Sequence, residues 1–203
     1  MVGDWILMMD DDHTFLPDML ERLLVHVISG AADVVCPFVL RRDYPWTPVA
    51  YVKPPAGLGG VVDISTIATH GLVTLDPRGK TGLIPVEETG TAGMLIHKRV
   101  LDGVEGPWFR VGETEADRLT EDRGFCRRAR MAGFRVAIDL DTPMGHMAKF
   151  VISPMKSTDP DTWPVMLISG HGTAMAVDVS KARENALPEY MGFGSNEKEE
   201  HGG

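Results

Sequence analysis

The chain has 203 residues, of which 43% are hydrophobic and 24% charged, a composition typical of a globular protein with one sizeable core or two small ones. Its 29 acidic and 20 basic residues give a net charge of −9, which argues against nucleic acid or an anionic membrane as a partner. The two cysteines, Cys36 and Cys126, are too few for a disulfide scaffold or a cysteine-rich zinc module. Both lie in apolar runs, so we expect buried thiols.

The sequence shows no sign of membrane insertion or export. No apolar run approaches the length of a membrane span, so we expect no transmembrane segment. The first nine residues carry no basic leader and run directly into three aspartates, which is unlike a signal peptide. We therefore expect a cytoplasmic protein.

The N-terminal part of the chain has the pattern of a strand, a helix and a second strand. Residues 4–9 form a short apolar run typical of a buried strand, and leucines at helical spacing predict a helix over 17–29 that Gly30 ends. The valine-rich run 32–40 predicts the second strand. Carboxylates that follow the first strand would then lie at the end of the sheet where α/β proteins bind ligands.

The rest of the chain predicts shorter elements. Proline and glycine interrupt residues 41–90, which favours strands or hairpins joined by loops. Further along we expect a strand at 91–96, a short helix at 98–101, a helix at 121–131 capped by Thr120 and ended by Gly133, a strand at 134–140, a loop at 139–146 and a strand at 163–169. These patterns predict an α/β fold over residues 1–150, a C-terminal extension over 151–194 and a disordered polar tail over 195–203.

The first candidate site is the acidic cluster of Asp10, Asp11 and Asp12, followed by His13. Hard divalent cations need several oxygen ligands, and alternate aspartates at a strand end can converge on one ion. Three adjacent carboxylates repel one another, and a cation would remove that repulsion. The alternative is a solvated turn that caps the following helix.

Two other templates share these residues. Asp10, Asp12 and Thr14 have the spacing of the nucleophile loop of haloacid-dehalogenase-like phosphatases, with Asp10 as nucleophile, although residues 139–141 are a poor substitute for the acidic pair that those enzymes need downstream. An EF-hand loop is excluded because Phe15 stands where glycine is required and a strand, not a helix, precedes the loop.

The second candidate site is the start of the predicted helix at 121–131. Acidic residues in a first helical turn are stabilised by the helix dipole, which is a sufficient structural reason for Glu121 and Asp122. Asp122 also shares its helical spacing with Cys126, Ala129 and Gly133, which places it on the inward face, with Arg123, Arg127 and Arg130 outward. An inward carboxylate at this position is a candidate general base.

The third candidate is His146, which follows Gly145 after the predicted strand at 134–140. A lone histidine in a loop is more often a hydrogen-bonding surface residue than a ligand. His26, His70 and His97 are set aside for that reason.

Taken in this order, the three sites resemble GT-A-type glycosyltransferases, especially the family 2-like group. The matching stretches span residues 4–147 and are Trp5–His13 with Phe15, Pro17, Asp18 and Leu20 after it, then Gly90–Ile96, Thr120–Phe134 and Gly145–His146. The resemblance implies a Rossmann-like mixed sheet flanked by helices. It also implies an N-terminal truncation, because the family's nucleoside-binding strands precede the Asp-x-Asp strand with which this sequence begins.

The resemblance implies a role for each site. Asp10 and Asp12 would hold Mn²⁺ or Mg²⁺ with His146, and Asp122 would be the base of an inverting transfer from a nucleotide-sugar donor to an acceptor hydroxyl. Donor- or acceptor-binding positions would be Asp11, Gly90, Thr91, Ala92, Gly93, Glu121 and Trp108. The motif of processive synthases is absent, so polymer synthesis is not expected.

The truncation leads to two further expectations. Activity would need a partner chain or upstream sequence that supplies the missing half, and apolar surface beside residues 4–9 and 32–40 would be exposed. A non-catalytic relic that binds metal or sugar without turnover is a third alternative, beside the transferase and the phosphatase.

Overall fold

The structure is a computed structural model that describes residues 3–42, 46–54, 67–68, 71–111, 119–149, 151–155, 165–170 and 173–178. Contacts divide the chain into two compact units, Met1–Ala148 and Lys149–Gly203. The predicted tail at 195–203 lies outside the described residues.

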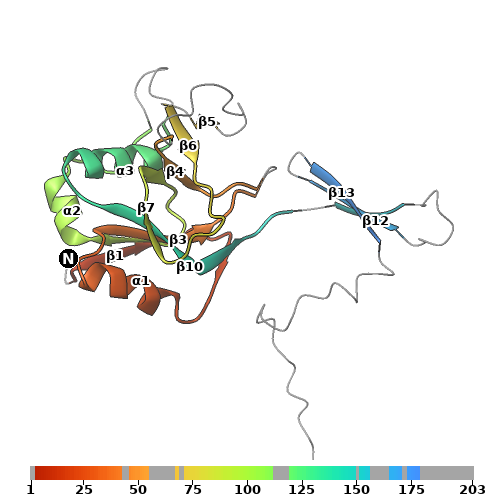
Figure 1. The fold of residues 1–203 in the computed structure, drawn as a ribbon, viewed down its shortest axis with the longest axis horizontal. Coiled ribbons are helices and arrows are strands. Elements are labelled where there is room, and N and C mark those ends of the chain that lie inside the picture. Colours follow the sequence, from red (N-terminus) through yellow and green to blue (C-terminus); the bar gives the residue numbers. More distant parts are fainter. Residues whose placement is uncertain are drawn as a thin grey trace, which may run out of the picture. The chain divides into compact units, whose positions relative to one another are not determined.

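The first unit is built on a six-stranded mixed sheet (Figure 1). The strands follow the order β1 (Trp5–Met8), β9 (Met94–His97), β3 (Val34–Val39), β10 (Val136–His146) and β2 (His13–Phe15), and β7 (Leu83–Pro85) also pairs with β10. Of the described strand pairs in this sheet, only β3–β10 is parallel. β1 and β3 do not pair directly, because β9 lies between them and runs antiparallel to both.

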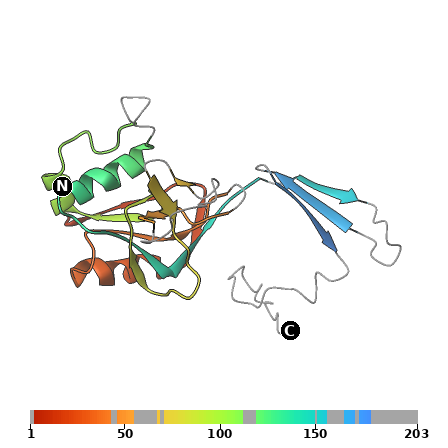
Figure 2. The ribbon, with the colours of Figure 1, turned by 45° about the horizontal axis from the view of Figure 1, so that its top comes forward.

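Helices cover both faces of this sheet (Figures 1 and 2). On one face, α1 (Met19–Ile28) packs its buried Leu23 and Val27 against a cluster that includes Val35. On the other face, α2 (Lys98–Gly103) and α3 (Glu121–Met131) pack against a cluster that includes Val34 and Cys36. Alternate residues of β3 thus enter opposite cores, which explains its continuous apolar run. The predicted α/β class, a mixed sheet flanked by helices, is confirmed.

Two smaller antiparallel sheets complete the described elements. Residues 41–90, predicted as strands or hairpins, contribute β7 and a four-stranded sheet in the order β5 (Ile67–Ala68), β6 (Leu72–Thr74), β4 (Ala50–Val52) and β8 (Glu88–Thr89). The second unit contains a three-stranded sheet of β11 (Val151–Met155), β12 (Val165–Gly170) and β13 (Thr173–Asp178).

Most of the helices and strands that the sequence predicted begin and end within a few residues of the expected positions. Gly30 and Gly133 adopt positive φ of 72° and 87° just after α1 and α3, as predicted for glycines that end helices. Thr120 is the N-cap of α3 by position, but its hydroxyl donates to the Asp122 carboxylate and makes no capping bond. β9 begins at Met94, not at residue 91, because a turn with Gly93 at φ 64° precedes it.

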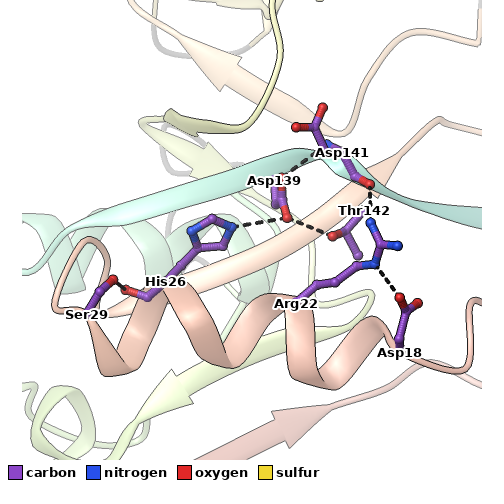
Figure 3. Close-up of polar contacts among 7 residues, drawn as sticks. All are labelled: Asp18, Arg22, His26, Ser29, Asp139, Asp141 and Thr142. Carbon is purple, nitrogen blue, oxygen red and sulfur yellow. Dashed lines mark hydrogen bonds and ion pairs between the residues drawn. The ribbon is translucent and has the colours of Figure 1, made fainter.

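The predicted loop at 139–146 is wrong, because β10 continues to His146 across a bulge between Asp139 and Pro143. The buried Asp139 carboxylate organises this bulge (Figure 3). It accepts hydrogen bonds from the Thr142 hydroxyl at 2.7 Å and the Asp141 backbone N–H at 3.1 Å, and it lies 3.1 Å from Nε2 of His26 on α1. Aspartate and proline in sequence indicated a loop, whereas they form a bulge that redirects the strand.

β1 is the outermost strand of the main sheet, and no strand among the described residues pairs with its outer edge. Its four residues are partly buried. The expectation of exposed apolar surface beside residues 32–40 is wrong, because β3 lies between β9 and β10 and is almost entirely buried.

Candidate metal site and general base

Asp12, His13 and His146 converge at one end of the main sheet. Each offers one ligand atom, and these atoms all lie within 4.8 Å of one another. His13 and His146 meet because they are direct partners in the antiparallel pairing of β2 with β10, and their rings stack with centroids 4.2 Å apart. Gly145 permits this pairing, since a side chain there would collide with the hydroxyl of Thr14.

A backbone contact orients His146. Its Nδ1 lies 2.9 Å from the carbonyl oxygen of Leu40, and its Nε2 lies 3.4 Å from Oδ2 of Asp12. Because a carbonyl oxygen only accepts, the contact favours the tautomer with the proton on Nδ1. Nε2 then presents its lone pair to Asp12 and His13, as in histidines that ligate metals.

His13 is buried and lacks the partners that a buried imidazole needs. Its side chain is 2% exposed, and neither ring nitrogen has a hydrogen-bond partner among the described residues. Nδ1 lies 2.8 Å from Oδ1 of Asp12, a distance that suits an ion pair, but the angles do not make a hydrogen bond. Burial lowers the pKa of His13, and His146 lowers it further against the opposing charges of Asp12 and Asp10. The neutral ring therefore keeps a lone pair, and a bound cation would satisfy it.

The Asp12 carboxylate lies beside one guanidinium and two imidazoles. Burial alone would raise its pKa, but the charges of His13, His146 and Arg42 outweigh that effect, so the pKa of Asp12 is lowered. Nη1 of Arg42 lies 2.7 Å from Oδ2. Asp12 is consequently an anion at neutral pH.

The other two aspartates of the cluster lie outside this group. Asp10 is exposed, with Oδ1 3.5 Å from the Thr91 hydroxyl, and Asp11 is exposed in the turn between β1 and β2. Of the predicted trio, the structure therefore brings Asp12 and His146 together and leaves Asp10 beside Thr91. Sequence reasoning missed His13 as a candidate ligand, because only the pairing of β2 with β10 places it against His146.

Asp122 lies partly buried in the first turn of α3. Burial raises its pKa, against hydrogen bonds that Oδ1 accepts from the Thr120 hydroxyl and, at 2.7 Å, from the Arg123 backbone N–H. Gly90 makes room for this carboxylate, since a Cβ there would lie 3.3 Å from Oδ2. Thr91 contacts Asp10, and its neighbour Gly90 leaves the space beside Asp122 open.

The prediction that Arg123 faces outward is wrong. Its side chain is 13% exposed, and its Nε and Nη2 both lie 2.7 Å from Oε2 of the buried Glu88 on β8. Its guanidinium also lies 4.2 Å from the ring centroid of Tyr51. A long side chain at the boundary between the buried and exposed faces of a helix can fold back toward the core. Its position on the helical wheel therefore does not determine whether it is buried. Arg127 is exposed, as predicted.

The residues predicted to bind donor or acceptor have mixed surroundings. Gly90, Ala92 and Gly93 are buried, and the Pro37 ring fills the space beside Gly93. Glu121 is exposed. The Trp108 indole N–H donates to the carbonyl oxygens of Leu101 and Val104, which fastens the segment after α2.

The cysteines are part of the core, and a hollow is described at the ends of two helices. Cys36 and Cys126 are buried free thiols, as predicted, and burial raises the pKa of Cys126 to about 12. A hollow of about 390 Å³ between the ends of α2 and α3 includes none of the predicted site residues.

The family model of glycosyl transferase family 2 matches residues 1–102, half of the chain. The chain belongs to this family. The family 2 match includes the acidic cluster and Gly90–Gly93, whereas Asp122 and His146 lie beyond it. Family membership supports glycosyl transfer over the phosphatase alternative.

Other comparisons add little to the family 2 assignment. No curated protein matches the chain. Among solved structures, the "Crystal Structure of A197 from STIV" is similar at 13% identity, covering 85% of this chain and 70% of that one with a TM-score of 0.47. No helix in the described part of the chain is long and apolar enough to cross a membrane.

Proposed function

We propose that this family 2 chain transfers a sugar, with inversion, from a nucleotide-sugar donor to an acceptor hydroxyl. Asp12, His13 and His146 would hold a divalent metal, and Asp122 would act as the base. The observation that carries the proposal is the buried imidazole of His13 beside Asp12 and His146, whose nitrogens lack hydrogen-bond partners in the described part of the chain.

The donor set favours one of the two expected metals. One carboxylate oxygen and two imidazole nitrogens suit Mn²⁺ better than Mg²⁺, which prefers an octahedral shell of oxygen ligands. When bound, the cation supplies positive charge against the departing nucleoside diphosphate. The protein contributes the Asp12 carboxylate, whose pKa is lowered by the surrounding charges despite burial, and the His13 imidazole, whose pKa burial lowers.

Asp122 supplies the proton acceptor in this proposal. The acceptor oxygen forms a bond to the anomeric carbon while the bond from that carbon to the phosphate oxygen breaks, and the hydroxyl proton passes to Asp122. Its Oδ1 already accepts two hydrogen bonds, so Oδ2 is the oxygen available for the proton. Burial raises the pKa of this carboxyl, which makes it a stronger base than an exposed aspartate.

The test is nucleoside diphosphate release from a panel of uridine, guanosine and thymidine diphosphate sugars, with Mn²⁺, Mg²⁺ or a chelator. We expect release with Mn²⁺ that the chelator abolishes. Asp12→Asn and Asp122→Asn should both lose release. Of these two variants, Asp122→Asn should still bind Mn²⁺ and Asp12→Asn should not. Asp11→Asn is the matched control, because it removes a carboxylate from the same turn outside the three-ligand group. Mn²⁺ binding without release from any donor, also when a nucleoside-binding half is supplied as a second chain, would contradict transfer and favour the non-catalytic alternative.

A further inference from the structure

Arg42 holds the carboxylate that the proposed metal needs. Its Nη1 lies 2.7 Å from Oδ2 of Asp12, the same oxygen that Nε2 of His146 faces at 3.4 Å. Arg42 follows β3 closely, two residues after Leu40, whose carbonyl oxygen orients His146. The guanidinium is therefore a positive charge of the protein itself, held beside the three-ligand group.

The contact is of a kind that a divalent cation can replace. The Arg42 side chain is 51% exposed and that of Asp12 is 32% exposed, so solvent screens their attraction and both groups can be rehydrated. A divalent cation brings twice the charge and would also bind the two imidazole nitrogens, which a guanidinium cannot do because it has only donors. Oδ2 cannot serve both cations fully, so their binding is competitive.

We infer that Arg42 is an internal competitor for the metal and a ligand for the donor's diphosphate. It neutralises Asp12 while the metal is absent, and it leaves that carboxylate when the metal binds. The released guanidinium then lies beside the cation with its donors free for phosphate oxygens, which it can bind in pairs. The inference rests on the proposed metal site and adds its regulation.

Arg42 couples the binding of the divalent metal to the binding of the diphosphate. Without a diphosphate, metal binding costs the Arg42–Asp12 contact, and nothing replaces it. With a diphosphate present, the guanidinium gains a new anionic partner as it loses the old one. Metal and diphosphate should therefore bind cooperatively, and by thermodynamic linkage each should strengthen the other by the same factor.

Calorimetric titration of Mn²⁺ into the full chain, with and without inorganic pyrophosphate, tests the competition. Arg42→Gln should bind Mn²⁺ alone about two- to five-fold more tightly than the unmodified chain, the range expected for the loss of one exposed ion pair. The same variant, once loaded with Mn²⁺, should bind pyrophosphate more weakly. Arg42→Lys keeps the positive charge, so its binding of Mn²⁺ and of pyrophosphate should be close to that of the unmodified chain. Arg41→Gln is the matched control, since it removes the same charge one residue away.

The outcomes separate this inference from the proposed function. Unchanged or weaker Mn²⁺ binding by Arg42→Gln, while the unmodified chain binds Mn²⁺, would overturn the competition and leave the metal site standing. An equal gain in Arg41→Gln would show an unspecific charge effect and would also overturn it. Full pyrophosphate binding by Mn²⁺-loaded Arg42→Gln would overturn the diphosphate role. If neither the unmodified chain nor Arg42→Gln binds Mn²⁺, the proposed metal site fails, and the inference fails with it.

Discussion

Asp12 and Asp122 are two carboxylates whose surroundings move their pKa values in opposite directions. Asp12 lies among His13, His146 and Arg42, and their charges lower its pKa despite burial. Asp122 lies at the start of α3, where burial raises its pKa despite two hydrogen bonds. One environment favours a permanent anion that suits a cation, and the other favours a carboxylate that takes up a proton. Opposite shifts of this kind suit the two tasks that we propose for these acids.

The ion pair between Arg123 and Glu88 helps to maintain the difference between the pKa values of Asp12 and Asp122. Although Arg123 is the next residue after Asp122, its guanidinium contacts Glu88 at 2.7 Å and the face of Tyr51. The buried pair directs a positive charge away from Asp122, whereas Arg42 directs one onto Asp12. The positions of Arg42 and Arg123 thus contribute to the different pKa values of Asp12 and Asp122.

The largest expected effect contrasts the two acids directly. Asp12→Asn should reduce Mn²⁺ binding below detection, because it removes the only carboxylate of the three-ligand group. Asp122→Asn should leave Mn²⁺ binding unchanged. Titration of Mn²⁺ into both variants measures this, and equal loss in the two would contradict separate roles.

The second prediction concerns the pair that directs Arg123. Glu88→Gln should lower the free energy of unfolding by about 3–5 kcal/mol, because it leaves a buried guanidinium without its counter-charge. Glu87→Gln is the matched control. It removes the neighbouring carboxylate, which pairs with the more exposed Arg130, and should cost about 1 kcal/mol or less. Urea denaturation measures both, and similar losses would show that burial of the pair adds nothing.

The third prediction tests whether His13 is a metal ligand. His13→Gln should weaken Mn²⁺ binding by at least roughly 10- to 100-fold, because removal of a group that only supports a metal ligand already costs that much. Asp10→Ala and Asp11→Ala should weaken it less, because neither carboxylate belongs to the three-ligand group. A greater loss in Asp10→Ala than in His13→Gln would restore the arrangement that the sequence predicted.

The smallest expected effect is on stability and depends on pH. Because the pKa of Asp122 is raised in the folded state, the folded protein binds more protons there than the unfolded chain, and ionisation of Asp122 destabilises the fold. Asp122→Asn should therefore raise the Tm slightly at pH 8, and the gain should fade as the pH falls toward the ordinary value of 3.8. Calorimetry of both proteins over this pH range measures the difference in Tm, and a difference that stays constant from pH 8 down to 3.8 would contradict this explanation.

Local patterns were enough to predict much of the fold and part of the site. Apolar periodicity and glycine predicted the strand before the aspartates, both long helices and the α/β class. The order of the acidic cluster, Gly90–Gly93 and Glu121–Asp122 carried the resemblance to family 2 that the family match confirms over residues 1–102. Roles of individual site residues remain predictions, which the titrations above address.

Only the tertiary structure decided which side chains meet. His13 faces His146 because β2 pairs with β10 in one register, and a shift of one residue would turn either ring to the other side of the sheet. β10 reaches His146 because the buried Asp139 holds a bulge where sequence indicated a loop. Arg123 turns inward because it pairs with Glu88, which lies on β8, 35 residues earlier in the chain. Sequence periodicity reports the face of one element, whereas these contacts depend on the pairing of elements that are distant along the chain.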